Sequence, residues 1–132
     1  MTSNPLAKKL LIKPGFRGAV VNAPVGYLDL LCPLLEGAAV EEHLEDGLDF
    51  VLLFAADLAE LRRHADKAVK AVRPRGLLWV GYRKGGQKAG TDLNRDLLWE
   101  AMSKHEMVGV SLVALDGTWS AMRFRPEADV GS

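Results

Sequence analysis

The chain has 132 residues, the usual size of one domain, and its 17 Lys and Arg residues balance 17 Asp and Glu residues. Zero formal charge argues against a general nucleic-acid binder, whose affinity comes largely from neutralising phosphates, and no apolar run approaches the roughly 20 residues of a membrane span. We therefore expect a single soluble, cytoplasmic domain over residues 1–132, with flexible ends outside a core at about residues 5–125, that binds neither nucleic acid nor membrane.

The first half of the chain predicts short elements. Residues 5–11 favour a short helix, and residues 17–22 are small and β-branched, which is typical of a strand that is apolar on both faces. A turn at residues 22–26 follows, then a helix at residues 27–35 and a short edge strand at residues 37–42.

Two longer patterns come next. Residues 48–54 form a nearly continuous apolar run, which suits a strand buried on both faces, as in parallel sheets. Residues 57–73 have apolar positions at steps of three and four, which predict an amphipathic helix. We expect Asp57 to cap this helix, Pro74 to end it, and Arg73 to lie favourably at its C-terminal dipole.

The chain closes with a strand, a helix and a hairpin. Residues 76–82 predict a second buried strand, and residues 93–102 predict a helix capped by Thr91 or Asp92. An Asp-Gly pair, the favoured two-residue turn of an antiparallel hairpin, separates two last strands at residues 108–115 and 118–124.

Strands that alternate with helices predict parallel βαβ units with right-handed crossovers. Helices then cover both faces of the sheet. We therefore expect the α/β class: a three-layer α/β/α sandwich with a mostly parallel, Rossmann-like sheet that ends in an antiparallel hairpin.

Three stretches of the second half carry a family resemblance. From residue 48 onward the chain resembles the C-terminal half of the S-adenosylmethionine-dependent methyltransferase fold. Residues 49–54 look like its fourth strand, residues 71–80 resemble its turn into the fifth strand, and the hairpin is similar to its terminal antiparallel pair. The whole chain resembles a group of uncharacterised bacterial proteins of about this length, from which no activity carries over. That second likeness rests on residues 12–15, 22–27 and 91–99.

The first half departs from the methyltransferase pattern. In that family the first strand ends in an acidic residue and a glycine-rich loop, whereas Asn22 to Tyr27 holds one glycine, Gly26, and a proline without a backbone N–H. The acidic residue of the second strand has no clear counterpart, and Glu41 and Glu42 are the nearest. The resemblance therefore implies a truncated methyltransferase-like fold, and we expect no cofactor.

The sequence contains no motif for metal binding or nucleophilic catalysis. The one cysteine, Cys32, lies in an apolar stretch that predicts a buried thiol, and a single cysteine cannot complete a zinc site. His43, His64 and His105 are too widely spaced to form a ligand pair on one helix. No serine lies in a Gly-x-Ser-x-Gly elbow, so a hydrolase is not supported.

A ligand site is expected where open α/β sheets place one, outside the carboxyl ends of the strands. Three loops gather there, and the loop at residues 83–95 carries glycines and cations before a helix N-terminus, which could attract a phosphate or carboxylate. The alternative is a solvated loop with glycines for turning. The candidate ligand-binding residues are Asn22, Gly26, Tyr27, Lys84, Thr91, Asn94 and Arg95.

Three functions remain open. The leading hypothesis is a non-catalytic Rossmann-like accessory protein that binds a small anionic ligand. The second is a small enzyme of unfamiliar type that uses Asp57 or Asp92 with Lys84. The third is a structural role through self-association as a homodimer, in which an edge strand or an apolar patch left by the terminal hairpin pairs with a second copy. The tryptophans are expected to be packing anchors, although an exposed Trp119 would mark an interface.

Overall fold

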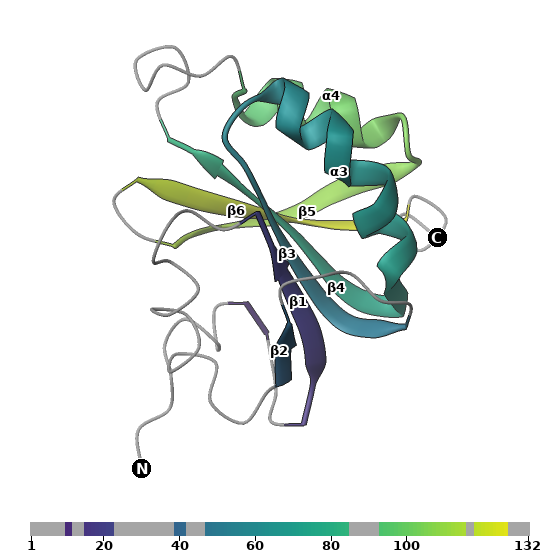
Figure 1. Ribbon diagram of the computed structural model, residues 1–132. Helices are drawn as coiled ribbons and strands as arrows, with labels where there is room; N and C mark the ends of the chain where they lie inside the picture. The colour runs from purple at the N-terminus through teal and green to yellow at the C-terminus, as the bar shows by residue number, and fades with distance from the viewer. Residues whose placement is uncertain are drawn as a thin grey trace.

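The computed structural model describes residues 10–11, 15–22, 39–41, 47–84, 93–115 and 118–126. These residues form a six-stranded sheet in the order β2-β1-β3-β4-β6-β5, with two helices (Figure 1). Along the chain the elements are β1 (Arg17–Val21), β2 (Ala39–Glu41), β3 (Leu48–Ala55), α3 (Leu58–Ala71), β4 (Val72–Arg83), α4 (Arg95–Ser103), β5 (Met107–Ala114) and β6 (Trp119–Pro126).

The sheet is mixed, as the sequence predicts. Strands β2, β1, β3 and β4 are parallel to one another, whereas β6 runs antiparallel to both β4 and β5. The last described strand, β6, therefore lies between β4 and β5. The α/β class, the mostly parallel sheet and the closing antiparallel hairpin are confirmed.

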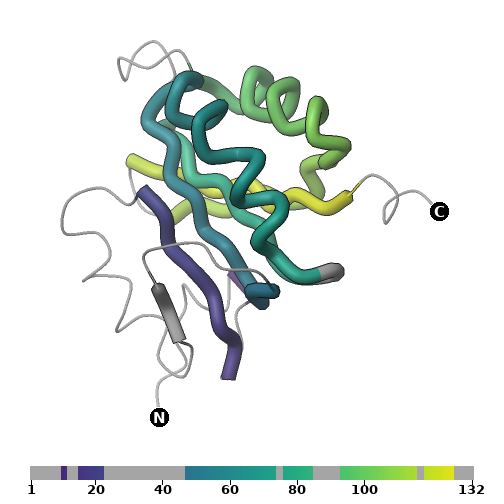
Figure 2. The backbone as a smooth tube through the Cα atoms, turned by 45° about the vertical axis from the view of Figure 1, so that its right-hand side comes forward, coloured from purple at the N-terminus to yellow at the C-terminus, as the bar shows by residue number. Residues whose placement is uncertain are grey.

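Helices α3 and α4 lie side by side on one face of the sheet (Figures 1 and 2). Helix α3 packs on β3 and β4, and α4 packs on β5. The helices expected at residues 5–11 and 27–35, together with Cys32 and the Asp-Gly turn, lie outside the described residues. A helical layer on the opposite face, and with it the three-layer sandwich, stays a prediction.

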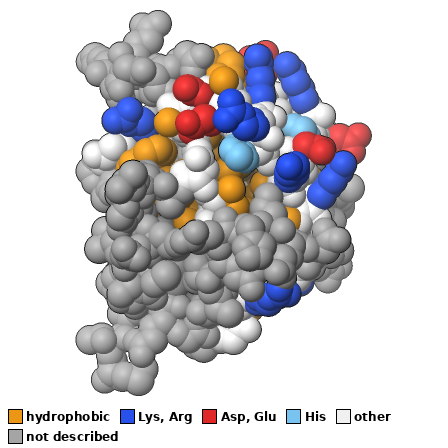
Figure 3. Space-filling model, viewed as in Figure 1, with side chains coloured by type: hydrophobic (Ala, Val, Ile, Leu, Met, Phe, Trp, Pro, Cys, Tyr) orange, Lys and Arg blue, Asp and Glu red, His pale blue; other side chains and the backbone are white. Residues whose placement is uncertain are grey.

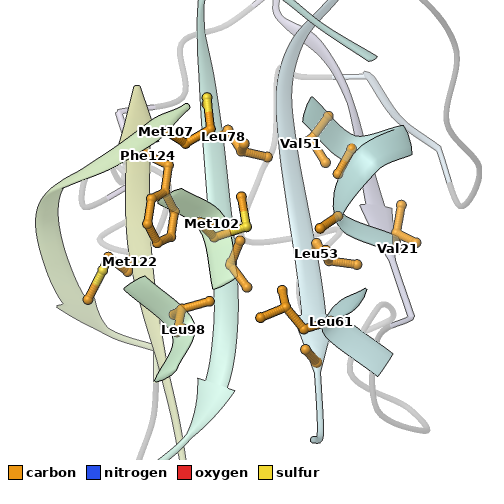
Figure 4. Close-up of a cluster of buried hydrophobic side chains, with 14 of the residues drawn as sticks. Val21, Val51, Leu53, Leu61, Leu78, Leu98, Met102, Met107, Met122 and Phe124 are labelled. Atoms are coloured by element: carbon orange, nitrogen blue, oxygen red, sulfur yellow. The ribbon is translucent and has the colours of Figure 1, made fainter. Parts of the chain in front are cut away.

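Strand β3 is the centre of two cores. On the helix side, Val51, Leu53 and Ala55 join a buried cluster with residues of α3 and α4 (Figure 4). On the opposite side, Phe50, Leu52 and Phe54 join a second cluster. All six side chains are fully buried, and each large one contributes about 1.5–3 kcal/mol relative to exposure.

Helix α3 follows its predicted pattern but ends early. Its buried residues, Leu61, Ala65, Ala68 and Ala71, lie on the predicted apolar face. The expectation that the helix runs on to Arg73 is wrong, because Val72 is already extended and opens β4. The helix cannot include Arg73 because the ring of Pro74 disfavours the helical conformation of the residue directly before it.

Two of the three tryptophans are packing anchors, as predicted. Trp79 is buried, and its Nε1 donates a hydrogen bond to the Leu10 carbonyl at 3.0 Å. Trp119 is also buried and meets Phe54 edge to face, with ring centroids 5.2 Å apart. For Trp99 the prediction is wrong: it is 43% exposed, because the neighbouring Leu98 takes the inward position on α4.

One ionic cluster ties the amino ends of three strands. Asp49 of β3 accepts a hydrogen bond from the Arg17 backbone N–H of β1 at 2.8 Å and another from Arg73 Nε of β4 at 2.6 Å. These two bonds, the Arg17 N–H first, hold the pKa of Asp49 below its ordinary value. Arg73, predicted to serve a helix dipole, instead bridges two strands and lies over the Phe16 ring.

We expect Asp49→Asn to lower the free energy of unfolding by about 1 kcal/mol at pH 7, because the uncharged amide weakens both bonds. A carboxyl whose pKa is lower in the folded state stabilises the fold above its unfolded pKa and loses that contribution as pH falls through the folded value. The difference in free energy of unfolding between wild type and Asp49→Asn, measured with urea, should therefore narrow below about pH 4.

The matched control is Asp66→Asn. Asp66 makes an exposed salt bridge with Lys70 at 3.1 Å, and such a pair contributes little. If Asp49→Asn lost no more free energy of unfolding than the control at pH 7, or if its loss did not change with pH, the stabilising role of the Asp49 carboxylate would be contradicted.

Candidate functional site

The carboxyl ends of β1, β3 and β4 meet at one edge of the sheet (Figure 2). Strand β1 has β2 on one side and β3 on the other. The chain therefore adds β2 on one side of β1 and then returns to add β3 on its other side. The edge between β1 and β3 is therefore the topological switch point, where open α/β sheets bind their ligands. Asn22 follows β1 there, and Ala56 and Asp57 follow β3.

Asn22 bridges this switch point. Its backbone adopts the left-handed conformation, at φ 59°, which asparagine tolerates better than most residues. Its Nδ2 donates to the Phe54 carbonyl at 2.9 Å and to Glu60 Oε1 at 2.7 Å. Because a side-chain amide nitrogen has two hydrogens, both are used within the protein.

Glu60 completes the bridge from α3. The same Oε1 atom accepts the Ala56 backbone N–H at 2.9 Å, while Asp57 Oδ1 accepts the Glu60 N–H at 2.8 Å. The arrangement resembles a capping box, in which an N-cap side chain and an acid three residues later satisfy each other's backbone groups, except that Glu60 accepts the N–H of Ala56, one residue before the cap. The prediction that Asp57 caps α3 is confirmed. The spacing of Asp57 and Glu60 is the sequence signal that could have revealed the role of Glu60.

Helix α4 starts later than predicted. Its N-cap is Asn94, whose Oδ1 accepts the Leu97 N–H at 2.9 Å, so the expected cap at Thr91 or Asp92 is wrong. Leu93 before the cap and Leu98 after it are both fully buried in one cluster, the pattern of a hydrophobic staple. That pair of leucines fixes the start of the helix and was a readable signal.

Cations lie along the same edge. Arg83 ends β4, and its Nε is buried with no hydrogen-bond partner among the described residues. The exposed Lys84 follows, and its backbone N–H donates to the Thr118 carbonyl at 2.8 Å. Burial raises the pKa of the Tyr82 phenol. The positive charge of Arg95, at the start of α4, lies near enough to oppose part of that rise.

The structure thus places four of the predicted site residues at or beside the carboxyl edge: Asn22, Lys84, Asn94 and Arg95. Two of them, Asn22 and Asn94, already hydrogen-bond within the protein. Gly26, Tyr27 and Thr91 lie outside the described residues, and ligand binding by the whole set stays a prediction. Sequence reasoning missed Glu60.

The edge offers no metal centre in the part of the chain that the structure describes, because no group of three His, Cys, Asp or Glu side chains lies close enough together. None of the helices in these residues has the length and apolar character that a membrane span requires.

Comparison with known proteins gives a match in structure alone. No family model matches the chain, and no curated protein does. A methyltransferase dependent on S-adenosylmethionine (SAM) from Aquifex aeolicus superposes with a TM-score of 0.62 at 13% identity, over 92% of this chain and 89% of that one. A TehB-like SAM-dependent methyltransferase from Corynebacterium glutamicum gives 0.60 at 11% identity, over 94% and 86%.

This chain has the Rossmann-like fold of the SAM-dependent methyltransferases. A third structure with this fold, the N-methyltransferase NodS from Bradyrhizobium japonicum in complex with S-adenosyl-L-homocysteine, gives a TM-score of 0.58 at 13% identity, over 93% of this chain and 88% of that one. The TM-scores establish the shared fold, and identities this low leave the activity open.

We expect Asn22→Asp to lower the free energy of unfolding by about 2 kcal/mol at pH 7. Aspartate keeps the size and tolerates the left-handed backbone, but it removes both donors and faces Glu60 with a like charge. Adding Glu60→Gln should recover part of the loss, because the second carboxylate is then gone. Urea unfolding of the single and double variants measures both effects.

Asn94→Asp is the control, since an aspartate at a helix N-cap keeps the acceptor and suits the helix dipole. It should leave stability nearly unchanged. An Asn22→Asp protein as stable as wild type would show that the amide does not hold the switch point together.

Proposed function

We propose that this protein is a non-catalytic, Rossmann-like binding protein that takes a small anionic ligand at the carboxyl edge of its sheet and transfers no methyl group. The observation that carries this proposal is the bridge at the switch point. The Asn22 amide and the Ala56 N–H, which could face a cofactor there, donate instead to Phe54 and Glu60.

The carboxylates at this edge support the non-catalytic part of the proposal. A general base must have a lone pair within reach of the substrate's proton. Asp57 and Glu60 both accept backbone N–H groups that hold the start of α3 in place. Using either one for proton transfer would break a hydrogen bond that holds the start of α3. This argues against Asp57 as a catalytic acid or base.

The cations support the anionic character of the ligand. A buried polar atom without a hydrogen-bond partner is costly, and Arg83 Nε is such an atom at the end of β4. A phosphate or carboxylate oxygen beside the guanidinium would satisfy it with a charge-assisted bond. Arg95 adds a second positive charge at the N-terminus of α4, where the helix dipole also favours an anion. The proposed anion site is therefore Gly26, Tyr27, Arg83, Lys84, Thr91, Asn94 and Arg95, with Asn22 holding the switch point beside it.

The second candidate function is binding of SAM itself. It is favoured by the neighbours, which include NodS in complex with S-adenosyl-L-homocysteine and LepI in complex with SAM. In this chain it would require the bridge between Asn22 and Glu60 to open. The two candidates therefore differ in what they predict for SAM and for a simple phosphate.

We expect a sugar phosphate or pyrophosphate to raise the melting temperature by about 10 °C at about 100 times its Kd, and SAM to leave it unchanged. Arg83→Gln should abolish the shift, whereas Arg63→Gln, on the exposed side of α3, should keep it. Incubation with SAM that carries a labelled methyl group should give no more labelling of a heat-inactivated cell extract with the protein than without it. A saturable shift with SAM, or any methyl transfer lost in Asn22→Asp, would overturn the proposal.

A further inference from the structure

The second edge of the sheet carries an unusual strand. Strand β5 pairs with β6 alone among the described strands, so its outer side is an edge. Natural edge strands are kept apart from one another by charges, prolines or short length. Strand β5 has eight residues, none charged and none proline, whereas the opposite edge strand, β2, has three and ends in Glu41. Among the described strands, the β5 edge is therefore the one left open to pairing.

A groove of about 430 Å³ runs between this edge and α4. It is lined by Arg95, Asp96, Trp99, Gly109, Val110, Ser111, Leu112 and Met122. Trp99 is 43% exposed and Leu112 is 45% exposed, and they are two of the three large apolar side chains that stand out on the described surface. The absence of a side chain on Gly109 makes room for the indole, since a Cβ there would meet the Trp99 ring at 3.0 Å. The groove thus joins an apolar surface to an exposed strand edge.

We infer that the outer edge of β5 and this groove form the contact by which two copies of the chain make a symmetric dimer. A β-bulge at Val110 interrupts the pairing with β6, and regular pairing resumes at Ser111. Residues 111–113 of each copy would pair antiparallel across a two-fold axis normal to the sheet, which continues the sheet from one copy into the other.

The side-chain arrangement favours a second copy as the partner. Leu112 lies opposite Met122, on the face that α4 covers, so a two-fold axis close to Leu112 brings the grooves of both copies together. The leucines and the Trp99 rings would then cover one another. An uncharged strand can lie against itself without opposing like charges, and the chain as a whole has zero formal charge. A strongly acidic or basic partner strand would find no complement on β5.

Light scattering after size exclusion tests the oligomeric state. We expect wild type to be a dimer at about 100 µM and to dissociate on dilution toward about 1 µM. Leu112→Lys should weaken the dimer roughly a hundredfold, because it places two like charges near the axis. Leu11→Lys is the matched control: Leu11 is 47% exposed and follows Leu10, which packs in the cluster on the sheet face opposite α4, so this variant should stay dimeric.

Tryptophan fluorescence of the wild type gives a readout that needs no variant. Trp79 and Trp119 are buried within each copy, so a change of emission on dilution reports on Trp99. We expect a red shift as the dimer dissociates and no shift in Trp99→Phe. A monomer at every concentration would overturn the inference. So would a dimer that survives Leu112→Lys with unchanged Trp99 emission, because the contact would then lie elsewhere.

Discussion

The structure depends on the burial of β3 on both of its faces. Phe50, Leu52 and Phe54 point to one side of the sheet and Val51 and Leu53 to the other, so neither face can be left to water. One face is covered by α3 and α4, whose outer surface carries the charged side chains visible in Figure 3. A strand of this kind belongs in the middle of a parallel sheet. Its place there brings β1 and β4 to its two sides and so sets where the carboxyl edge lies.

The same sheet order creates a switch point, and the chain fills it with its own side chains. In the methyltransferase pattern a glycine-rich loop follows the first strand, and its backbone N–H groups face the cofactor. Here the residue after β1 is Asn22, which links β1 to β3 through the Phe54 carbonyl and to α3 through Glu60. The amide therefore contributes to stability at the position where the related fold would contribute to binding. The chain thus shares the sheet of this fold and has the bridge between Asn22 and Glu60 at its switch point.

The sequence predicted those parts of the fold that local patterns determine. The apolar run of β3, the periodicity of α3 and the hairpin of β5 and β6 were all readable. The bonds of Asn22 to Glu60 and of Asp49 to Arg73 were not, because they join residues 38 and 24 positions apart and depend on the order of the strands.

The exposure of Trp99 was also hidden from the sequence. Leu97, Leu98 and Trp99 are consecutive apolar residues, and only the packing of α4 on β5 decides which of them faces inward.

Nuclear magnetic resonance of ¹⁵N-labelled protein tests the central claim, that the Asn22 amide holds the switch point together, most directly, since this side-chain amide has its own pair of signals. We predict that these signals keep their positions in excess SAM, because the Asn22 amide stays bonded to Phe54 and Glu60. A saturable shift of the Asn22 side-chain and Ala56 backbone signals on addition of SAM would contradict the account.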